Sequence, residues 1–137
     1  MEFEHRLRVR FQDVDAARII FFSRYFEYAH TAYVEWLRVL GLPLGKLLDA
    51  AEVGLPLAHA EADFHSPARF DDELVVTVGV ERLGQTSASF VFPITTPSGE
   101  KRATVRTTHV CIDTKTFRPT PWPDEIRTAL AGSQTAG

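Results

Sequence analysis

Two aspartates separated by one residue, Asp13 and Asp15, stand between an alternating segment and the only long helical pattern of the sequence. A carboxylate can attack an electrophilic carbon or remove a proton from water. Residues 19–22 are apolar, and a helix begins near Ser23. A carboxylate beside the amino end of a buried helix is a candidate site for chemistry. The competing interpretation is that each aspartate only caps a turn or the helix.

The helix that would position these groups has a clear period. Its apolar residues recur every three or four positions, which predicts one broad buried face. Ser23 suits the N-cap, Gly41 suits the position after the last helical residue, and Pro43 ends the pattern. The apolar positions are Tyr25, Phe26, Ala29, Ala32, Tyr33, Trp36, Leu37 and Leu40.

The rest of the chain predicts strands. Alternating or β-rich segments lie at 3–12, 55–64, 74–80, 85–94 and 101–114, with a short helix at 44–51 and helical turns at 124–130. Tight turns join the last strands, so we expect an antiparallel sheet of five strands packed on the long helix, an α+β fold. Pro93 predicts an edge or a bulge in its strand.

Length and composition limit the class of protein. We expect a single domain at 1–130 and a disordered tail at 131–137 in this 137-residue chain. A net charge of -3 argues against a nucleic-acid surface. The single cysteine, Cys111, cannot form an internal disulfide, and no Cys/His spacing in the sequence suggests a zinc site. We expect no cofactor. No signal peptide and no apolar run of roughly 20 residues is present, so we expect a cytoplasmic protein without membrane contact.

The segment 11–25, FQDVDAARIIFFSRY, resembles the hotdog-fold acyl-CoA thioesterases of the 4-hydroxybenzoyl-CoA thioesterase type, with similarity extending over about residues 8–112. Segments 54–60, 63–68 and 108–112 are more specifically similar to 1,4-dihydroxy-2-naphthoyl-CoA thioesterases. The resemblance implies a hotdog fold, in which the sheet wraps around one long central helix. It also implies hydrolysis of an aromatic acyl-CoA thioester.

The resemblance assigns the catalytic carboxylate to Asp15, as nucleophile or as general base. It places the oxyanion donor at the backbone amides of Phe22 and Ser23, where helix geometry leaves N–H groups unpaired. Asp13 is expected to accept loop amides instead. Arg18 stands where these enzymes usually carry Gly, which permits backbone conformations that Arg adopts only at a cost. Its side chain could alternatively bind an anionic group of the ligand.

Three further residues are candidates for substrate binding. Tyr25 is at core spacing and could line the acyl pocket. His30 matches a ring-contacting position of the hydroxybenzoyl enzymes, although it could simply pair with Glu27 on the helix face. His59 lies on the polar face of its strand, where a solvated histidine is the alternative. Cys111 is expected to be a buried structural thiol.

The implied partner is a coenzyme A thioester, with Arg82, Lys101 and Arg102 as possible phosphate contacts. The resemblance implies a homodimer or homotetramer, with segment 55–64 as an exposed sheet edge. Other interpretations remain open: a non-catalytic acyl-CoA binding domain, a thioesterase for short aliphatic acyl groups, or a dehydratase with a histidine-centred site.

Overall fold

The computed structural model describes residues 3–50 and 52–134. The main sheet comprises β1 (Glu4–Arg8), β3 (Leu57–Phe64), β4 (Glu73–Thr77), β5 (Gly79–Leu83), β6 (Ser87–Thr95) and β7 (Lys101–Val110). The helices are α1 (Ser23–Val39), α2 (Leu44–Ala50) and α3 (Asp124–Ala131), and Phe11–Asp13 forms one 3₁₀ turn. Strands β2 (Val53–Gly54) and β8 (Ile112–Asp113) pair separately.

The main sheet is antiparallel, in the order β1-β4-β6-β7-β3, and β5 also pairs with β6. On β6, alternate residues are buried beneath the helix layer, and these are Ala88, Phe90, Phe92 and Ile94. This period-two burial is the physical signature of a sheet covered on one face. The predicted α+β class with an antiparallel sheet is confirmed.

The predicted count of five strands is wrong, because the segment expected to form the third strand is divided at Val78 into β4 and β5. Pro93 of β6 lies opposite Thr77, the last residue of β4 before this break. Proline has no amide hydrogen to donate, so the ladder is interrupted there. Pro93 nevertheless pairs with Thr104 on the other side, so β6 is an interior strand and not an edge. The alternative prediction of a bulge agrees with the register shift between Ile94 and Thr95 of the same strand.

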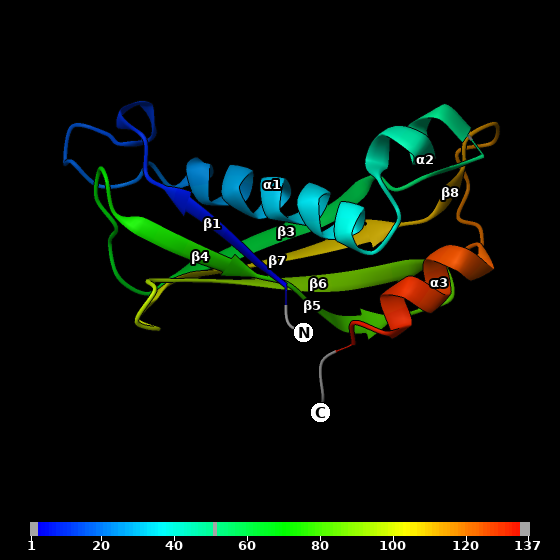
Figure 1. The fold of residues 1–137 in the computed structure, drawn as a ribbon. Helices are drawn as coiled ribbons and strands as arrows, with labels where there is room; N and C mark the ends of the chain where they lie inside the picture. Colours follow the sequence, from blue (N-terminus) through cyan, green and yellow to red (C-terminus); the bar gives the residue numbers. More distant parts are fainter. Residues whose placement is uncertain (1–2, 51, 135–137) are drawn as a thin grey trace.

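Helix α1 lies along one face of the sheet (Figure 1). Ala29 and Ala32, at 1% and 0% exposure, permit a close approach of the helix backbone to the strands. The Trp36 ring meets Phe90 edge to face at a centroid distance of 5.3 Å. This packing is typical of aromatic pairs in a dense core.

The end of α1 follows the prediction and its start does not. Gly41 has φ +80°, and its amide donates to Arg38 O while Leu42 N donates to Leu37 O, as in a glycine-terminated helix. At the other end Phe22 is the N-cap and Ser23 is the first helical residue. No side chain caps this end, so the Ser23 hydroxyl does not perform the predicted role.

The predicted short helices are present as α2 and α3. Helix α3 lies beside β5 (Figure 1), with Ile126 and Leu130 buried. Helix α3 ends at Ala131, and Ser133 O accepts the Val80 amide at 3.2 Å, while the disordered tail expected at residues 131–137 stays a prediction. Residues 135–137 of that tail lie outside the described residues. Within the described part, no helix is long and apolar enough to cross a bilayer.

Strand β3 forms one edge of the sheet, and seven of its eight residues are exposed. The expected close packing of its alanines on the helix is not seen, because only Ala62 is even partly buried. α1 covers the middle strands, and β3 lies beyond them at the edge. A register shift between Leu57 and His59 bends the end of the strand.

Candidate active site

Asp15 begins a tight turn that leads into α1. Its amide donates to Ile19 O at 3.0 Å, and its carbonyl accepts from Arg18 N at 2.9 Å. The Asp15 Oδ1 atom accepts the Ala17 amide at 2.8 Å, the usual way in which Asp stabilises the first position of a turn. The carboxylate is exposed, and its Oδ2 atom has no protein partner among the described residues. It is therefore positioned by the backbone and available to a ligand.

Arg18 adopts the left-handed conformation, with φ +68°. This is the last position of the turn, where glycine is preferred because it has no Cβ to clash. The concern raised by the sequence, that Arg occupies a position suited to Gly, is confirmed by this backbone angle. The guanidinium is exposed to solvent beside the Asp15 turn.

Replacing Arg18 with Gly is expected to stabilise the fold by about 1 kcal/mol, since the left-handed penalty of a residue with a Cβ is removed. The free energy of unfolding, measured by denaturant titration, tests this. Ala17→Gly is the matched control: Ala17 has negative φ, so the same substitution there should destabilise. A gain at both positions, or at neither, would contradict the assignment of strain to Arg18.

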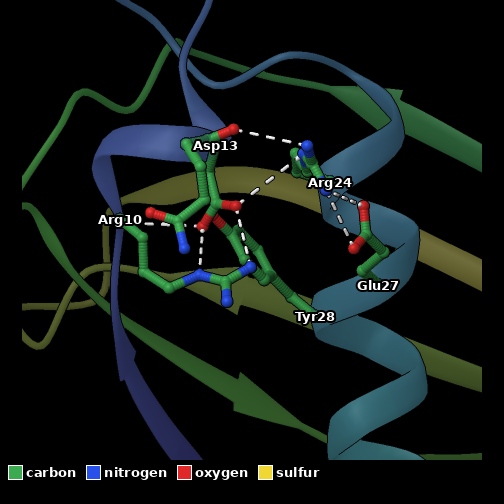
Figure 2. Close-up of polar contacts among 6 residues, drawn as sticks. Arg10, Asp13, Arg24, Glu27 and Tyr28 are labelled. Carbon is green, nitrogen blue, oxygen red and sulfur yellow. Dashed lines mark hydrogen bonds and ion pairs between the residues drawn. The ribbon is translucent and has the colours of Figure 1, made fainter.

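Asp13 is fully buried and is the centre of a polar cluster (Figure 2). Arg10 approaches it with Nη2 2.9 Å from Oδ1, Nε 3.1 Å from Oδ2, and its own amide 3.2 Å from Oδ2. The Tyr28 hydroxyl of α1 donates to Oδ2 at 2.7 Å. Arg24 Nε lies 3.7 Å from Oδ1, and Arg24 also pairs with Glu27. The prediction that Asp13 accepts loop amides holds for one amide, that of Arg10, and the other hydrogen bonds to the carboxylate come from the Arg10 and Tyr28 side chains.

The cluster keeps Asp13 ionised. Burial alone would raise the pKa of this carboxyl, but hydrogen bonds from Arg10 and Tyr28 outweigh burial and hold the pKa below 3.8. Burial, followed by the bond to Asp13, raises the pKa of the Tyr28 phenol, so Tyr28 stays a neutral donor. The backbone carbonyl of Asp13 also accepts the Phe21 amide at 2.9 Å. Asp13 thereby joins the Asp15 turn to the start of α1.

The amides of Phe22 and Ser23 stand free at this start. The Arg24 amide donates to Phe21 O, and the Tyr25 amide donates to Phe22 O. The Phe21 amide donates to Asp13 O. Within residues 3–50 and 52–134, neither Phe22 N nor Ser23 N donates to a protein acceptor. Unpaired first-turn amides can stabilise a negative oxygen.

A first cavity of about 370 Å³ includes Phe22 in its lining. Its lining combines the end of the Asp15 turn, the first turn of α1 and the segment after β3, and consists of Ile19, Ile20, Phe22, Tyr25, Phe64, His65, Ser66 and Pro67. Tyr25 is buried, packs 5.5 Å from the Phe64 ring, and has its pKa raised by burial. The structure thus brings Tyr25 and Phe22 to one apolar space.

His30 and His59 lie elsewhere. His30 is exposed and lines a second cavity, while Glu27 pairs with Arg24 at 2.9 Å and not with His30. His59 faces away from α1, with its Nε2 atom 3.5 Å from the Glu61 carboxylate. The structure does not bring His59 to either cavity within this chain.

The second cavity, also about 370 Å³, lies between α1, α2 and the β3–β7 side of the sheet. Two of its polar residues, Thr107 and His109 of β7, were not predicted as site residues. Their only sequence signal is that both occupy helix-facing positions of an otherwise apolar strand face.

The structure defines the contacts of Arg102, one of the possible phosphate contacts, and the burial of the Cys111 thiol. Arg102 Nη1 donates to Ser66 Oγ at 2.7 Å, which places this guanidinium next to a residue of the first cavity. Cys111 is fully buried, and burial raises the pKa of its thiol, as suits a structural residue. In the described part of the chain, no three His, Cys, Asp or Glu side chains gather as metal ligands.

An antiparallel sheet with one long helix along its face is the arrangement seen in the hotdog thioesterases that this chain resembles in structure. Residues 9–130 match the thioesterase-like superfamily, and the chain belongs to that family.

Individual proteins of known name are similar to this chain in sequence and in structure. The chain is 30% identical over 126 residues to a 1,4-dihydroxy-2-naphthoyl-CoA hydrolase of Nostoc punctiforme, covering 92% of this chain and 84% of the relative. The crystal structure of a 1,4-dihydroxy-2-naphthoyl-CoA thioesterase from Synechocystis superposes with a TM-score of 0.89 at 28% identity, covering 96% of each chain. A gentisyl-coenzyme A thioesterase gives 0.83 at 26% identity, covering 94% of this chain and 99% of that one.

Proposed function

We propose that this protein hydrolyses the thioester bond of an aromatic acyl-coenzyme A. The observation that carries the proposal is the apolar first cavity, which is lined by Phe22, a residue whose backbone amide is unpaired. Ile19 and Ile20, which directly follow the Asp15 turn in the sequence, form part of the lining of this cavity. Similar proteins named for dihydroxynaphthoyl and gentisyl thioesters support an aromatic acyl group.

Two routes fit the arrangement. In the first, the Asp15 carboxylate attacks the carbonyl carbon, the coenzyme A thiolate leaves and takes a proton from water, and water hydrolyses the resulting anhydride. In the second, Asp15 removes a proton from water as the resulting hydroxide attacks the carbonyl carbon, the C–S bond then breaks, and the proton on Asp15 passes to the departing coenzyme A thiolate. Both routes place negative charge on the carbonyl oxygen, which the amides of Phe22 and Ser23 would stabilise. Tyr25 would line the acyl pocket, and Arg18 would meet an anionic part of the substrate.

The proposal extends to organisation. Residues 1–130 would form one hotdog domain whose sheet curls around α1 as its central helix. The chain would act as a homodimer or homotetramer, since β3 presents a long unpaired edge with Leu57 and Phe64 about half exposed. Such an edge is normally covered in a native protein.

A turnover screen tests the function. Release of free coenzyme A thiol is measured for benzoyl-, 4-hydroxybenzoyl-, 1,4-dihydroxy-2-naphthoyl- and short aliphatic acyl-CoA. We expect kcat/KM for the best aromatic substrate to exceed the aliphatic values by about 10-fold or more, because differential contacts in an apolar pocket supply that much. Tight binding without release would instead indicate a non-catalytic binding domain, and a preference for aliphatic substrates would overturn the acyl assignment.

A further inference from the structure

One wall of the first cavity, formed by residues 64–67, is attached to a single point of β7. The carbonyl of Arg102 accepts the His65 amide at 2.9 Å and the Ser66 amide at 3.3 Å. The Ser66 hydroxyl donates to Lys101 O at 2.7 Å and accepts from Arg102 Nη1 at 2.7 Å. The position of this wall therefore depends on residues 101 and 102 of β7.

A register shift in the sheet coincides with Arg102. Lys101 of β7 pairs with Thr95 of β6. Ala103 pairs with the residue before Thr95, which is Ile94, so the register changes at Arg102. Irregularities of this kind re-aim a side chain and are frequent next to active sites. The Arg102 side chain is only 19% exposed, so the guanidinium is largely withdrawn from solvent and donates to the cavity wall.

The surroundings of this guanidinium do not compensate its burial. The Arg102 Nε atom is buried and has no hydrogen-bond partner among residues 3–50 and 52–134. The carboxylate of Glu100 lies 3.4 Å from Nη2, but the Glu100 side chain is 67% exposed. A charged group withdrawn from water without a close, buried partner destabilises a fold. Arg102 is therefore poorly explained as a stabilising residue, which points to a role at the cavity.

The charge of Arg102 also reaches the α1 side of the cavity. Burial raises the pKa of the Tyr25 phenol, and a backbone hydrogen bond at Ala68 and the Arg102 charge oppose this rise. Tyr25 belongs to α1 and lines the cavity, and its ring lies 5.5 Å from that of Phe64 in the wall. Arg102 thus acts on the two elements between which the cavity lies.

We propose that Arg102 is a positioning residue for the hydrolysis and acts through Ser66. By holding the wall at residues 64–67, it fixes the width of the first cavity and keeps the thioester carbonyl near the unpaired amide of Phe22. Small displacements of a reacting group cost large factors in rate, so a wall of fixed position matters for turnover. This inference rests on the proposed function for the reaction, and it differs from a contact between Arg102 and a coenzyme A phosphate.

The test compares a full substrate with a truncated one. Release of free thiol is measured for the aromatic acyl group preferred in the turnover screen, as its coenzyme A thioester and as its N-acetylcysteamine thioester, which carries no phosphate. Arg102→Met removes the guanidinium and keeps an apolar stem. It is expected to lower kcat by about 10-fold or more for both thioesters, with a smaller change in KM, because positioning and not binding is lost. A loss confined to the coenzyme A thioester would assign Arg102 to a phosphate contact and overturn the inference.

Two further variants separate positioning from folding. Arg102→Lys keeps a positive charge and a donor for Ser66 Oγ, so it should recover part of the lost kcat. Ser66→Ala removes the acceptor and should lower kcat by a similar factor. Adding Arg102→Met to Ser66→Ala should cost little more, because both substitutions remove the same 2.7 Å contact.

Arg106→Met is the matched control. Arg106 lies four residues further along β7, pairs with Glu81 at 3.0 Å and lines neither cavity, so kcat should stay at the wild-type value. Wild-type kcat in both Arg102→Met and Ser66→Ala, measured on folded protein, would overturn the inference, as would additive losses in the double variant. A failure of the hydrolase proposal is seen separately, as absence of turnover by the wild-type protein.

Discussion

Asp15→Asn is expected to lower kcat by about 100-fold or more while the affinity for acyl-CoA stays close to that of wild type. The amide side chain can still accept the Ala17 amide, which lies 2.8 Å from Oδ1, so the turn keeps its geometry. It can neither attack a thioester nor remove a proton from water, and loss of a general base typically costs roughly 10²–10⁴ in rate. Steady-state release of coenzyme A and equilibrium binding of a substrate analogue measure the two quantities.

Asp113→Asn provides the control for this change. Asp113 Oδ1 accepts the Lys115 amide at 2.8 Å and the Thr116 amide at 3.1 Å, so it performs the same local role in an exposed turn that lines neither cavity. Its replacement should leave turnover unchanged. Near wild-type turnover in Asp15→Asn would remove Asp15 from the chemistry and move the catalytic role to another residue of the junction.

Asp13→Asn is expected to destabilise the protein by about 2 kcal/mol and to reduce turnover as well. The substitution faces an amide NH₂ toward donors of Arg10 or Tyr28 and leaves at least one of them unpaired. We expect less than the full cost of breaking a buried ion pair, because the Arg10 side chain remains 56% exposed and can be hydrated. Turnover should fall because the weakened side-chain contacts hold the backbone of residue 13 less firmly, and its carbonyl accepts the Phe21 amide next to the free amide of Phe22.

Tyr28→Phe removes one bond of the same cluster and should cost less than Asp13→Asn. The double variant should lose less free energy of unfolding than the sum of the two single losses, since both substitutions remove the same 2.7 Å contact.

The stability advantage of wild type over Asp13→Asn should also depend on pH. Because the folded-state pKa of Asp13 lies below 3.8, the advantage is complete well above pH 3.8 and shrinks as the pH falls below it. Denaturant unfolding between pH 2 and pH 7 measures this (roughly, the range of carboxyl titration). Additive losses, or an advantage that grows toward low pH, would contradict a charged Asp13 at the centre of the cluster.

Local patterns in the sequence were sufficient for several features. The helical period located α1, and Gly41 ended it with the expected positive φ. Alternation predicted the antiparallel sheet and its buried face. The departure from Gly at Arg18 indicated a strained backbone, which is present. Each of these rests on interactions within a few residues, so a short stretch of sequence contains the relevant physics.

Other features required the folded chain. The division of the third predicted strand depends on Pro93, more than ten residues away, lying opposite Thr77 at the end of β4. Tyr28 reaches Asp13 only because α1 docks against the turn, and Thr107 and His109 meet His30 only because β7 lies beneath that helix.

The sequence by itself therefore determined most of the elements and placed two aspartates at their junction, and the resemblance to the thioesterases was needed to choose Asp15 between them. Only the tertiary structure decided which polar atoms are paired and which remain free. The reason is physical: burial and hydrogen-bond pairing depend on which distant segments pack together, and no local periodicity specifies that packing.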